Sequence, residues 1–157
     1  MVALSVSISA RTSPLSTVSP SFLTHLASLP SVQAAETVDA TLYKNPSCRC
    51  CDQYAAYLRQ YDYEIKVTET PNLRQFKAEH GVPSRLQSCH TMLLDGYVIE
   101  GHVPVGVINK LLDERPEIRG VSLPGMPQGS PGMSGQKREP FVIYAITDDE
   151  MQIYATD

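Results

Sequence analysis

Three cysteines within four residues, Cys48, Cys50 and Cys51, constrain this chain more than any other feature of its sequence. A strand-like pattern over 40–44 leads through a short turn to the cysteines, and a helical pattern over 51–61 follows them. The thiols are therefore expected at a helix N-terminus, where unpaired amides and the helix dipole favour an anion. Because a thiolate is both a nucleophile and a metal ligand, this stretch is the first candidate for function.

The size and charge of the chain limit what it can be. A length of 157 residues, 42% of them hydrophobic, is enough for one globular domain with a real core. The formal net charge of -4 gives no reason to expect a nucleic-acid partner. No apolar run reaches the length that a membrane span needs, so the mature form is expected to have no span and to be soluble.

Residues 1–36 differ in composition from the rest of the chain. They are rich in serine, and Arg11 is the only lysine or arginine among them. The small residues at 31–35 provide a site for signal peptidase, which predicts an export signal and a periplasmic or secreted protein. A disordered leader or a start codon placed too early would also account for this composition. The remaining residues, 37–157, are expected to form a single domain.

The pattern of the remaining chain predicts an α/β fold with the order βαβα followed by ββα. The clearest local signal is Asp95-Gly96 between two apolar runs, which is typical of a tight hairpin between antiparallel strands. The predicted elements are a strand at 40–44, a helix at 51–61, a strand at 64–69, a helix from Thr70-Pro71 to Gly81, strands at 91–94 and 97–100, and a helix from Pro104 to Pro116.

This order over residues 40–115 resembles the thioredoxin-like fold, whose cysteine motif lies between the first strand and the first helix. In that fold the third strand runs antiparallel beside the first, and the loop before it touches the cysteine motif. That loop usually carries a cis-proline, whereas here it contains Cys89 and His90. If the topology holds, a fourth cysteine and a histidine converge on the other three.

A loop rich in glycine and proline, 120–135, follows the last predicted helix and contains Met126 and Met133. Both methionines end a Pro-Gly-Met tripeptide. They are candidate thioether ligands for a soft metal, or hydrophobic plugs over the sheet. Two strands at 141–147 and 151–155 then predict a C-terminal β-hairpin.

Four cysteines leave several chemistries open. A bridge between Cys48 and Cys51 has the C-x-x-C redox spacing, but it leaves Cys50 and Cys89 without a role. Two structural disulfides are an alternative in an exported domain. A four-thiolate zinc site is another, although three ligands from four consecutive residues strain one tetrahedron. Thiolates that bridge two or more Cu(I) ions relax that constraint, and soft sulfur selects Cu(I).

The four histidines are not equally good candidates for metal ligands. His25 lies in the leader, and His80 lies in the last turn of a predicted helix, where a cation complements the dipole. His90 is adjacent to Cys89 and is the better candidate. His102 is a weaker candidate, because a polar residue before Pro104 can also serve to fix a turn.

Four stretches together resemble the CopG-like family of small bacterial metal-binding proteins, which are often encoded beside copper-resistance genes: Tyr43–Cys51, Ser88–Thr91, Asp95–Pro104 and Pro124–Pro127. The resemblance implies a periplasmic, thioredoxin-like protein that binds Cu(I) through its cysteines.

We therefore expect a metal-binding protein, rather than an enzyme, that sequesters Cu(I) in copper resistance or homeostasis, with zinc the less favoured ion. A thiol-disulfide oxidoreductase using Cys48 and Cys51 is the alternative, and docking to a copper chaperone or pump is a third hypothesis. The candidate ligands are Cys48, Cys50, Cys51, Cys89, His90, His102, Met126 and Met133.

Overall fold

The computed structural model describes residues 37–157, so the predicted leader over 1–36 lies outside the described residues. The strands are β1 (Val38–Lys44), β2 (Tyr63–Glu69), β3 (His90–Leu94), β4 (Tyr97–Glu100), β5 (Gly120–Ser122), β6 (Val142–Ile146) and β7 (Gln152–Thr156). The helices are α1 (Arg49–Leu58), α2 (Leu73–Glu79) and α3 (Val105–Glu114), with short 3-10 turns η1 (Arg59–Tyr61) and η2 (Ser84–Leu86).

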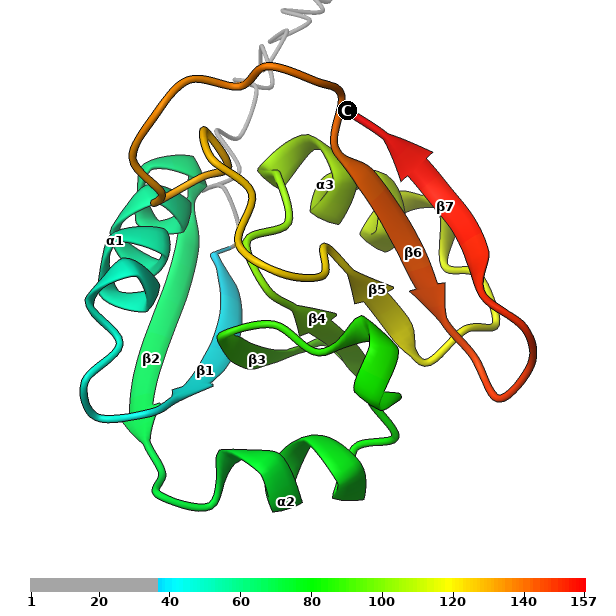
Figure 1. Ribbon diagram of the computed structural model, residues 1–157, viewed down its shortest axis with the longest axis horizontal. Coiled ribbons are helices and arrows are strands. Elements are labelled where there is room, and N and C mark those ends of the chain that lie inside the picture. The colour runs from blue at the N-terminus through cyan, green and yellow to red at the C-terminus, as the bar shows by residue number, and fades with distance from the viewer. Residues whose placement is uncertain (1–36) are drawn as a thin grey trace, which may run out of the picture. The chain divides into compact units, whose positions relative to one another are not determined.

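The described strands form one mixed sheet in the order β2-β1-β3-β4-β5-β6-β7 (Figure 1). β1 pairs in parallel with β2 and antiparallel with β3, and β3 pairs antiparallel with β4. The predicted α/β class and the βαβα-ββα order are confirmed from β1 to α3. The central pairing of β1 with β3 is the contact that positions the candidate site.

The two faces of the sheet carry different helices. Ala40 and Leu42 of β1 point into a core shared with α1 and α3, and Leu42 is completely buried. Burying a side chain of that size contributes roughly 1.5–3 kcal/mol. Tyr43, the residue after Leu42, points to the opposite face, because side chains alternate along a strand. There it stacks on Phe76 of α2, with 4.1 Å between the ring centroids, so α2 covers the face away from α1 and α3 (Figure 1).

The turn between β3 and β4 has the geometry that its sequence predicts. Asp95 and Gly96 both have positive φ angles, 46° and 84°. A two-residue hairpin turn of this kind matches the natural twist of the strands, and glycine and aspartate tolerate it best. The predicted hairpin is confirmed.

The predicted bounds of two helices are wrong by a few residues. α1 begins at Arg49, with Cys48 as its N-cap, and the helical turn at 59–61 is 3-10 rather than α-helical. α2 begins at Leu73, after an N-cap at Asn72, instead of at Thr70-Pro71. The first correction matters for the site, since Cys50 and Cys51 lie inside the first helical turn and not before it.

The predicted loop over 120–135 also begins too early, because Gly120–Ser122 forms β5 in parallel beside β4. Gly120 has no room for a side chain, since a Cβ atom there would lie 1.8 Å from the carbonyl oxygen of Val98. β6 and β7 form the predicted C-terminal hairpin, which extends the sheet. Among the helices of residues 37–157, none has the length and apolar character of a membrane span.

Candidate metal centre

The connection from β1 to α1 brings the first three thiols together. The amide of Cys48 donates a hydrogen bond of 3.0 Å to the carbonyl of Asn45, which closes the turn. Cys50 and Cys51 follow in the first turn of α1, where the amides have no partner within the helix. Cys51 is completely buried, whereas Cys48 and Cys50 are partly exposed.

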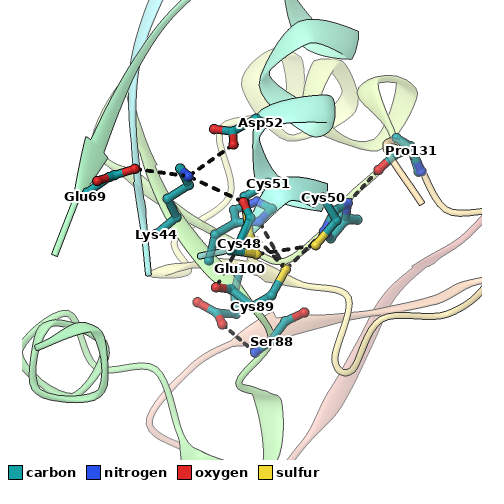
Figure 2. Close-up of a disulfide and its surroundings, with 12 residues drawn as sticks. Lys44, Cys48, Cys50, Cys51, Asp52, Glu69, Ser88, Cys89, Glu100 and Pro131 are labelled. Atoms are coloured by element: carbon teal, nitrogen blue, oxygen red, sulfur yellow. Dashed lines mark hydrogen bonds and ion pairs between the residues drawn. A yellow bond between two sulfur atoms is a disulfide. The ribbon is translucent and has the colours of Figure 1, made fainter. Parts of the chain in front are cut away.

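Cys48 and Cys51 are joined by a disulfide, with their Cα atoms 5.6 Å apart (Figure 2). Cys50 and Cys89 are free thiols. The Sγ atom of Cys50 lies 3.3 Å from that of Cys48. The C-x-x-C pair is therefore in its oxidised form, with a free thiol directly beside it.

Lys44, at the end of β1, ties this turn to the sheet. Its ammonium group is buried and donates to the carboxylate of Asp52 over 3.1 Å and to the carbonyl of Cys48 over 3.4 Å. Glu69 is a second carboxylate partner at 3.4 Å. A positive charge beside thiols favours their thiolate form. Two carboxylates share the charge of Lys44, however, so the main role of Lys44 is to fasten the cysteine turn to β1 and β2.

Cys89 reaches the other thiols from the loop before β3. The β1–β3 register pairs Lys44 with His90, so the residue before His90 must lie beside the β1–α1 connection. The Sγ atom of Cys89 lies 3.6 Å from that of Cys51. All four Sγ atoms lie within 4.8 Å of one another (Figure 2). The structure thus brings together the four cysteines that the topology predicted to converge, and their binding of a metal stays a prediction.

The two candidate histidines flank Cys89. Its Sγ atom lies 3.0 Å from Nε2 of His102 and 3.4 Å from Nδ1 of His90. Both rings are completely buried. Nδ1 of His102 lies 2.5 Å from the carbonyl oxygen of Pro131. Because a carbonyl only accepts hydrogen bonds, Nδ1 carries the proton, and Nε2 of the neutral ring offers its lone pair toward Cys89.

A second group of possible metal ligands therefore shares residues with the group of four cysteines. Cys51, Cys89, His90 and His102 each offer one atom, and these atoms also lie within 4.8 Å of one another. Nε2 of His90 is buried and has no hydrogen-bond partner among the described residues. An imidazole nitrogen and a thiolate are both ligands for copper and zinc.

Tyr54 of α1 holds the two imidazole rings. It is completely buried, and its hydroxyl donates to the carbonyl of Val103 over 2.8 Å. Its ring centroid lies 4.7 Å from that of His90 and 5.1 Å from that of His102. The sequence places Tyr54 on the inner face of the helix, but nothing in its spacing indicates contact with residues 36 and 48 positions later.

Burial sets the protonation states of the metal-free site. Burial, with Cys50 as the next cause, raises the pKa of the Cys89 thiol to about 12. Burial also lowers the pKa of His90 well below its usual range, with His102 and Lys77 as smaller causes, and it lowers the pKa of His102. The metal-free site is therefore neutral at Cys89 and at both histidines. A bound cation reverses this preference for the thiol, because metal ligation deprotonates it.

These histidines predict how the stability of the metal-free protein depends on pH. Both pKa values are lowered from the usual 6.5, so below that pH the unfolded chain binds protons that the folded chain excludes. Stability is therefore complete above about pH 6.5 and falls on acidification, by up to ~1.4 kcal/mol per pH unit for each histidine. Urea unfolding at several pH values between 7.5 and 5.5 measures it.

The matched variant for this measurement is His102→Gln, which should lose about half of that pH slope. Burial raises the pKa of Glu100, which opposes the histidine effect at lower pH, but this contribution is common to both proteins. Equal slopes in the wild type and His102→Gln would contradict the assignment.

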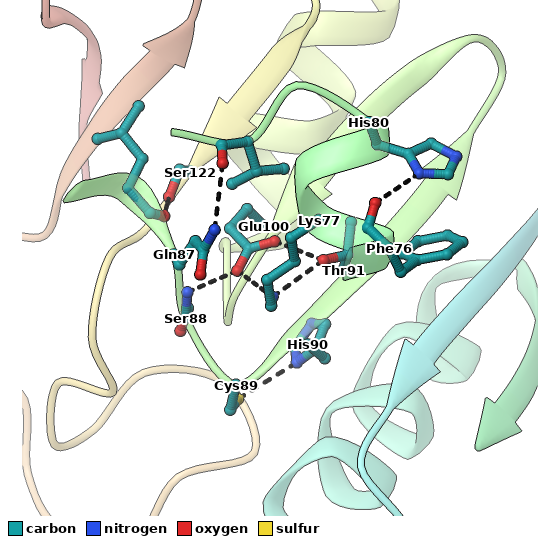
Figure 3. A network of polar contacts seen from close by, with 12 residues as sticks. Phe76, Lys77, His80, Gln87, Ser88, Cys89, His90, Thr91, Glu100 and Ser122 are labelled. Carbon is teal, nitrogen blue, oxygen red and sulfur yellow. Dashed lines mark hydrogen bonds and ion pairs between the residues drawn. The ribbon is translucent and has the colours of Figure 1, made fainter. Parts of the chain in front are cut away.

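A buried polar network supports the Cys89 loop from the α2 side of the sheet (Figure 3). Lys77 of α2 forms an ion pair with Glu100 at the end of β4, and both side chains are almost completely buried. The carboxylate of Glu100 also accepts hydrogen bonds from the hydroxyl of Thr91, at 2.6 Å, and from the amide of Ser88, at 2.5 Å. Since Ser88 precedes Cys89, this carboxylate fixes the backbone that carries the fourth thiol.

The backbone of the Gly/Pro loop packs against the elements that form the site. Gly125 forms a bridge to Ser88, and a Cβ atom on Gly132 would lie 2.6 Å from the amide nitrogen of Tyr54. Met126 is 53% exposed, so the expectation of a hydrophobic plug over the sheet is wrong for it. Met133 is half-buried. Ligation by either thioether stays a prediction.

Comparisons with known proteins agree with this geometry. A family model described as "Protein of unknown function, DUF411" matches residues 86–133. Two solved structures titled "Copper resistance protein copG", Form 2 and Form 1, are each 31% identical to the chain. They superpose with TM-scores of 0.72 and 0.71, and the match covers 78% of this chain and 99% and 98% of those chains. No curated protein matches the chain.

Proposed function

Because this chain belongs to the CopG-like family, we propose that it is a copper-binding protein that sequesters Cu(I) in copper resistance or homeostasis. The observation that carries the proposal is the gathering of four cysteine sulfurs within 4.8 Å of one another. Thiolate sulfurs that share bridging ions lie at such separations, given metal-to-sulfur distances of about 2.3 Å. The two similar structures are of copper resistance proteins, which supports copper as the ion.

The first step of the proposed function is reduction of the Cys48–Cys51 disulfide by an external dithiol, which is itself oxidised to a disulfide. This reduction releases two thiols into the same small volume as Cys50 and Cys89, so that all four can become thiolates toward Cu(I). Neutral His90 and His102 lie within reach of Cys89 and complete the donor set. Four soft sulfurs favour Cu(I) over harder ions.

Zinc is the less favoured ion for this donor set. Three of the four thiols come from one helical turn and its N-cap, a spacing that suits ions bridged by shared thiolates better than a single tetrahedral ion. We place the protein in the periplasm or outside the cell, where a Cys48–Cys51 disulfide persists in an oxidising environment. Copper ions, and other copper-handling proteins, are the proposed partners.

A specific observation also favours a second function. The disulfide of the C-x-x-C pair is the form in which a thiol-disulfide oxidoreductase accepts electrons. In such an enzyme Cys48 is the attacking thiol, since it is partly exposed, and the buried Cys51 resolves the mixed disulfide.

Anaerobic Cu(I) titration of the fully reduced protein tests the proposed function. We expect more than one Cu(I) per chain in competition with a chromogenic Cu(I) chelator, because bridging thiolates hold several ions. The oxidised protein, in which two thiols are blocked, should bind fewer. Insulin reduction is measured on the same samples, and it should be slow beside that of a thioredoxin.

Two results would redirect the assignment. Binding of one zinc ion with negligible copper under competition would favour a structural zinc site. Fast insulin reduction that bound copper does not inhibit would favour the oxidoreductase.

A further inference from the structure

Each sulfur of the Cys48–Cys51 disulfide has a free thiol beside it. Cys50 lies 3.3 Å from the Cys48 sulfur, and Cys89 lies 3.6 Å from the Cys51 sulfur. The two ends of the disulfide differ in access, since Cys48 is partly exposed and Cys51 has no exposed surface. A thiol from solution can therefore attack only at Cys48, and an attack on Cys51 has to come from within the protein.

We propose that Cys89 makes this internal attack, so that the disulfide moves from Cys48–Cys51 to Cys51–Cys89. The Cys89 thiolate forms a bond to the Cys51 sulfur, the bond between Cys48 and Cys51 breaks, and Cys48 leaves as the thiolate. Cys89 loses its proton to solvent as it attacks across the 3.6 Å between the two sulfurs, and Cys48 takes up a proton from solvent after it leaves, so the number of protons is unchanged. One disulfide is broken and one is formed, so the exchange needs no oxidant or reductant.

The structure favours Cys89 over Cys50 as the attacking thiol. The Cys50 sulfur also lies close to the disulfide, 3.3 Å from that of Cys48, but its attack there would join two residues only two positions apart in one turn of the chain. Cys89 belongs to a separate element, the loop before β3, and approaches the buried sulfur from across the sheet edge. A Cys51–Cys89 bond therefore links two elements that already meet, without closing a small ring within one helical turn.

The exchange changes what the oxidised protein presents to solvent. It places the disulfide at the buried Cys51 and leaves Cys48 and Cys50, the partly exposed pair, as free thiols. This consequence rests on the proposed function: two thiolates suffice to hold one soft ion such as Cu(I), so the oxidised chain keeps a reduced binding site. The oxidised protein then has its disulfide between Cys51 and Cys89, while the free thiols of Cys48 and Cys50 can still bind a metal ion.

Trypsin digestion separates the two disulfide isomers, because Arg49 divides the cysteine motif. Cleavage places Cys48 on peptide 45–49, Cys51 on peptide 50–59 and Cys89 on peptide 86–110. In metal-free Cys50→Ser protein, the original disulfide joins peptides 45–49 and 50–59. The exchanged disulfide joins peptides 50–59 and 86–110. The variant is oxidised with one equivalent of diamide, equilibrated at pH 8, quenched with acid, alkylated and mapped by mass spectrometry.

We expect the exchanged pair in at least about a tenth of the chains, since a tenfold ratio corresponds to the free energy of one ordinary contact. The double variant Cys48→Ser with Cys50→Ser, oxidised in the same way, should form the Cys51–Cys89 disulfide within the monomer. The proposal is overturned if the exchanged pair is below about one chain in a hundred in Cys50→Ser. It is also overturned if this double variant yields only reduced or intermolecularly linked protein. Because no metal is present, this outcome is independent of whether the reduced protein binds Cu(I).

Discussion

Replacing Cys89 with serine should lower the Cu(I) capacity of the reduced protein by at least about half, because one thiolate in a shared cluster holds more than one ion. Cys89 belongs to both donor groups of the site, and it is the one cysteine among residues 37–157 that does not come from the β1–α1 connection. Serine is nearly the same size but is a hard, weakly binding ligand. Anaerobic titration against a Cu(I) chelator measures the capacity.

Two controls separate a lost ligand from a lost fold. Circular dichroism of the metal-free Cys89→Ser protein should match that of the wild type, since the residue is only half-buried. His80→Ala is the matched replacement outside the site. The Nδ1 atom of His80 lies 2.8 Å from the carbonyl of Phe76, so the ring is held on its own helix, and its loss should leave the capacity unchanged. A folded Cys89→Ser protein with full capacity would exclude Cys89 from the binding site.

The sequence contains enough to predict the order of the elements, because each one has a strong local signal. The Asp95-Gly96 turn, the alternating Ile65 and Val67, and the helical apolar pattern before Pro116 are all local features. The convergence of Cys89 on the first three cysteines follows from that order, since the β1–β3 pairing requires it. The fourth thiol was therefore predictable, although forty-one positions separate it from Cys48.

What could not be predicted depends on long-range contacts. β5 has only three residues, Gly120–Ser122, and its strand character comes from its neighbours β4 and β6 rather than from its own pattern. The two buried histidines pack against Tyr54, and His102 also contacts a carbonyl in the Gly/Pro loop. Burial, followed by the nearby Cys50, raises the pKa of Cys89. No sequence spacing indicates these neighbours.

The Lys77–Glu100 ion pair is also a long-range contact, but the sequence gives a weak indication of it. Lys77 lies at a helix position that faces the sheet, between the apolar Leu73 and the end of α2. Glu100 ends β4, whose four residues are all buried. A charged residue at an inward position of each of two elements indicates a buried ion pair. The sequence alone does not show that the two positions meet, or that the pair holds the Cys89 loop.

Replacing Glu100 with alanine should therefore destabilise the protein by about 3–5 kcal/mol, the usual effect of removing one partner from a buried ion pair. The change leaves the Lys77 ammonium buried without its carboxylate, and it removes the acceptor for the hydroxyl of Thr91 and the amide of Ser88. Urea unfolding of the metal-free protein measures the loss. The loosened Ser88 amide should also make the Cys89 thiol react faster with an alkylating reagent.

A second carboxylate provides the matched control. Glu114 pairs with Lys110 on α3, but both side chains are exposed by more than 40%, so Glu114→Ala should destabilise the protein far less than Glu100→Ala. The double replacement Lys77→Met with Glu100→Leu should be less destabilising than Glu100→Ala alone, because it removes both charges and refills the space. If Glu100→Ala is no more harmful than Glu114→Ala, the buried pair does not support the Cys89 loop, and the position of the fourth thiol depends on the β1–β3 pairing alone.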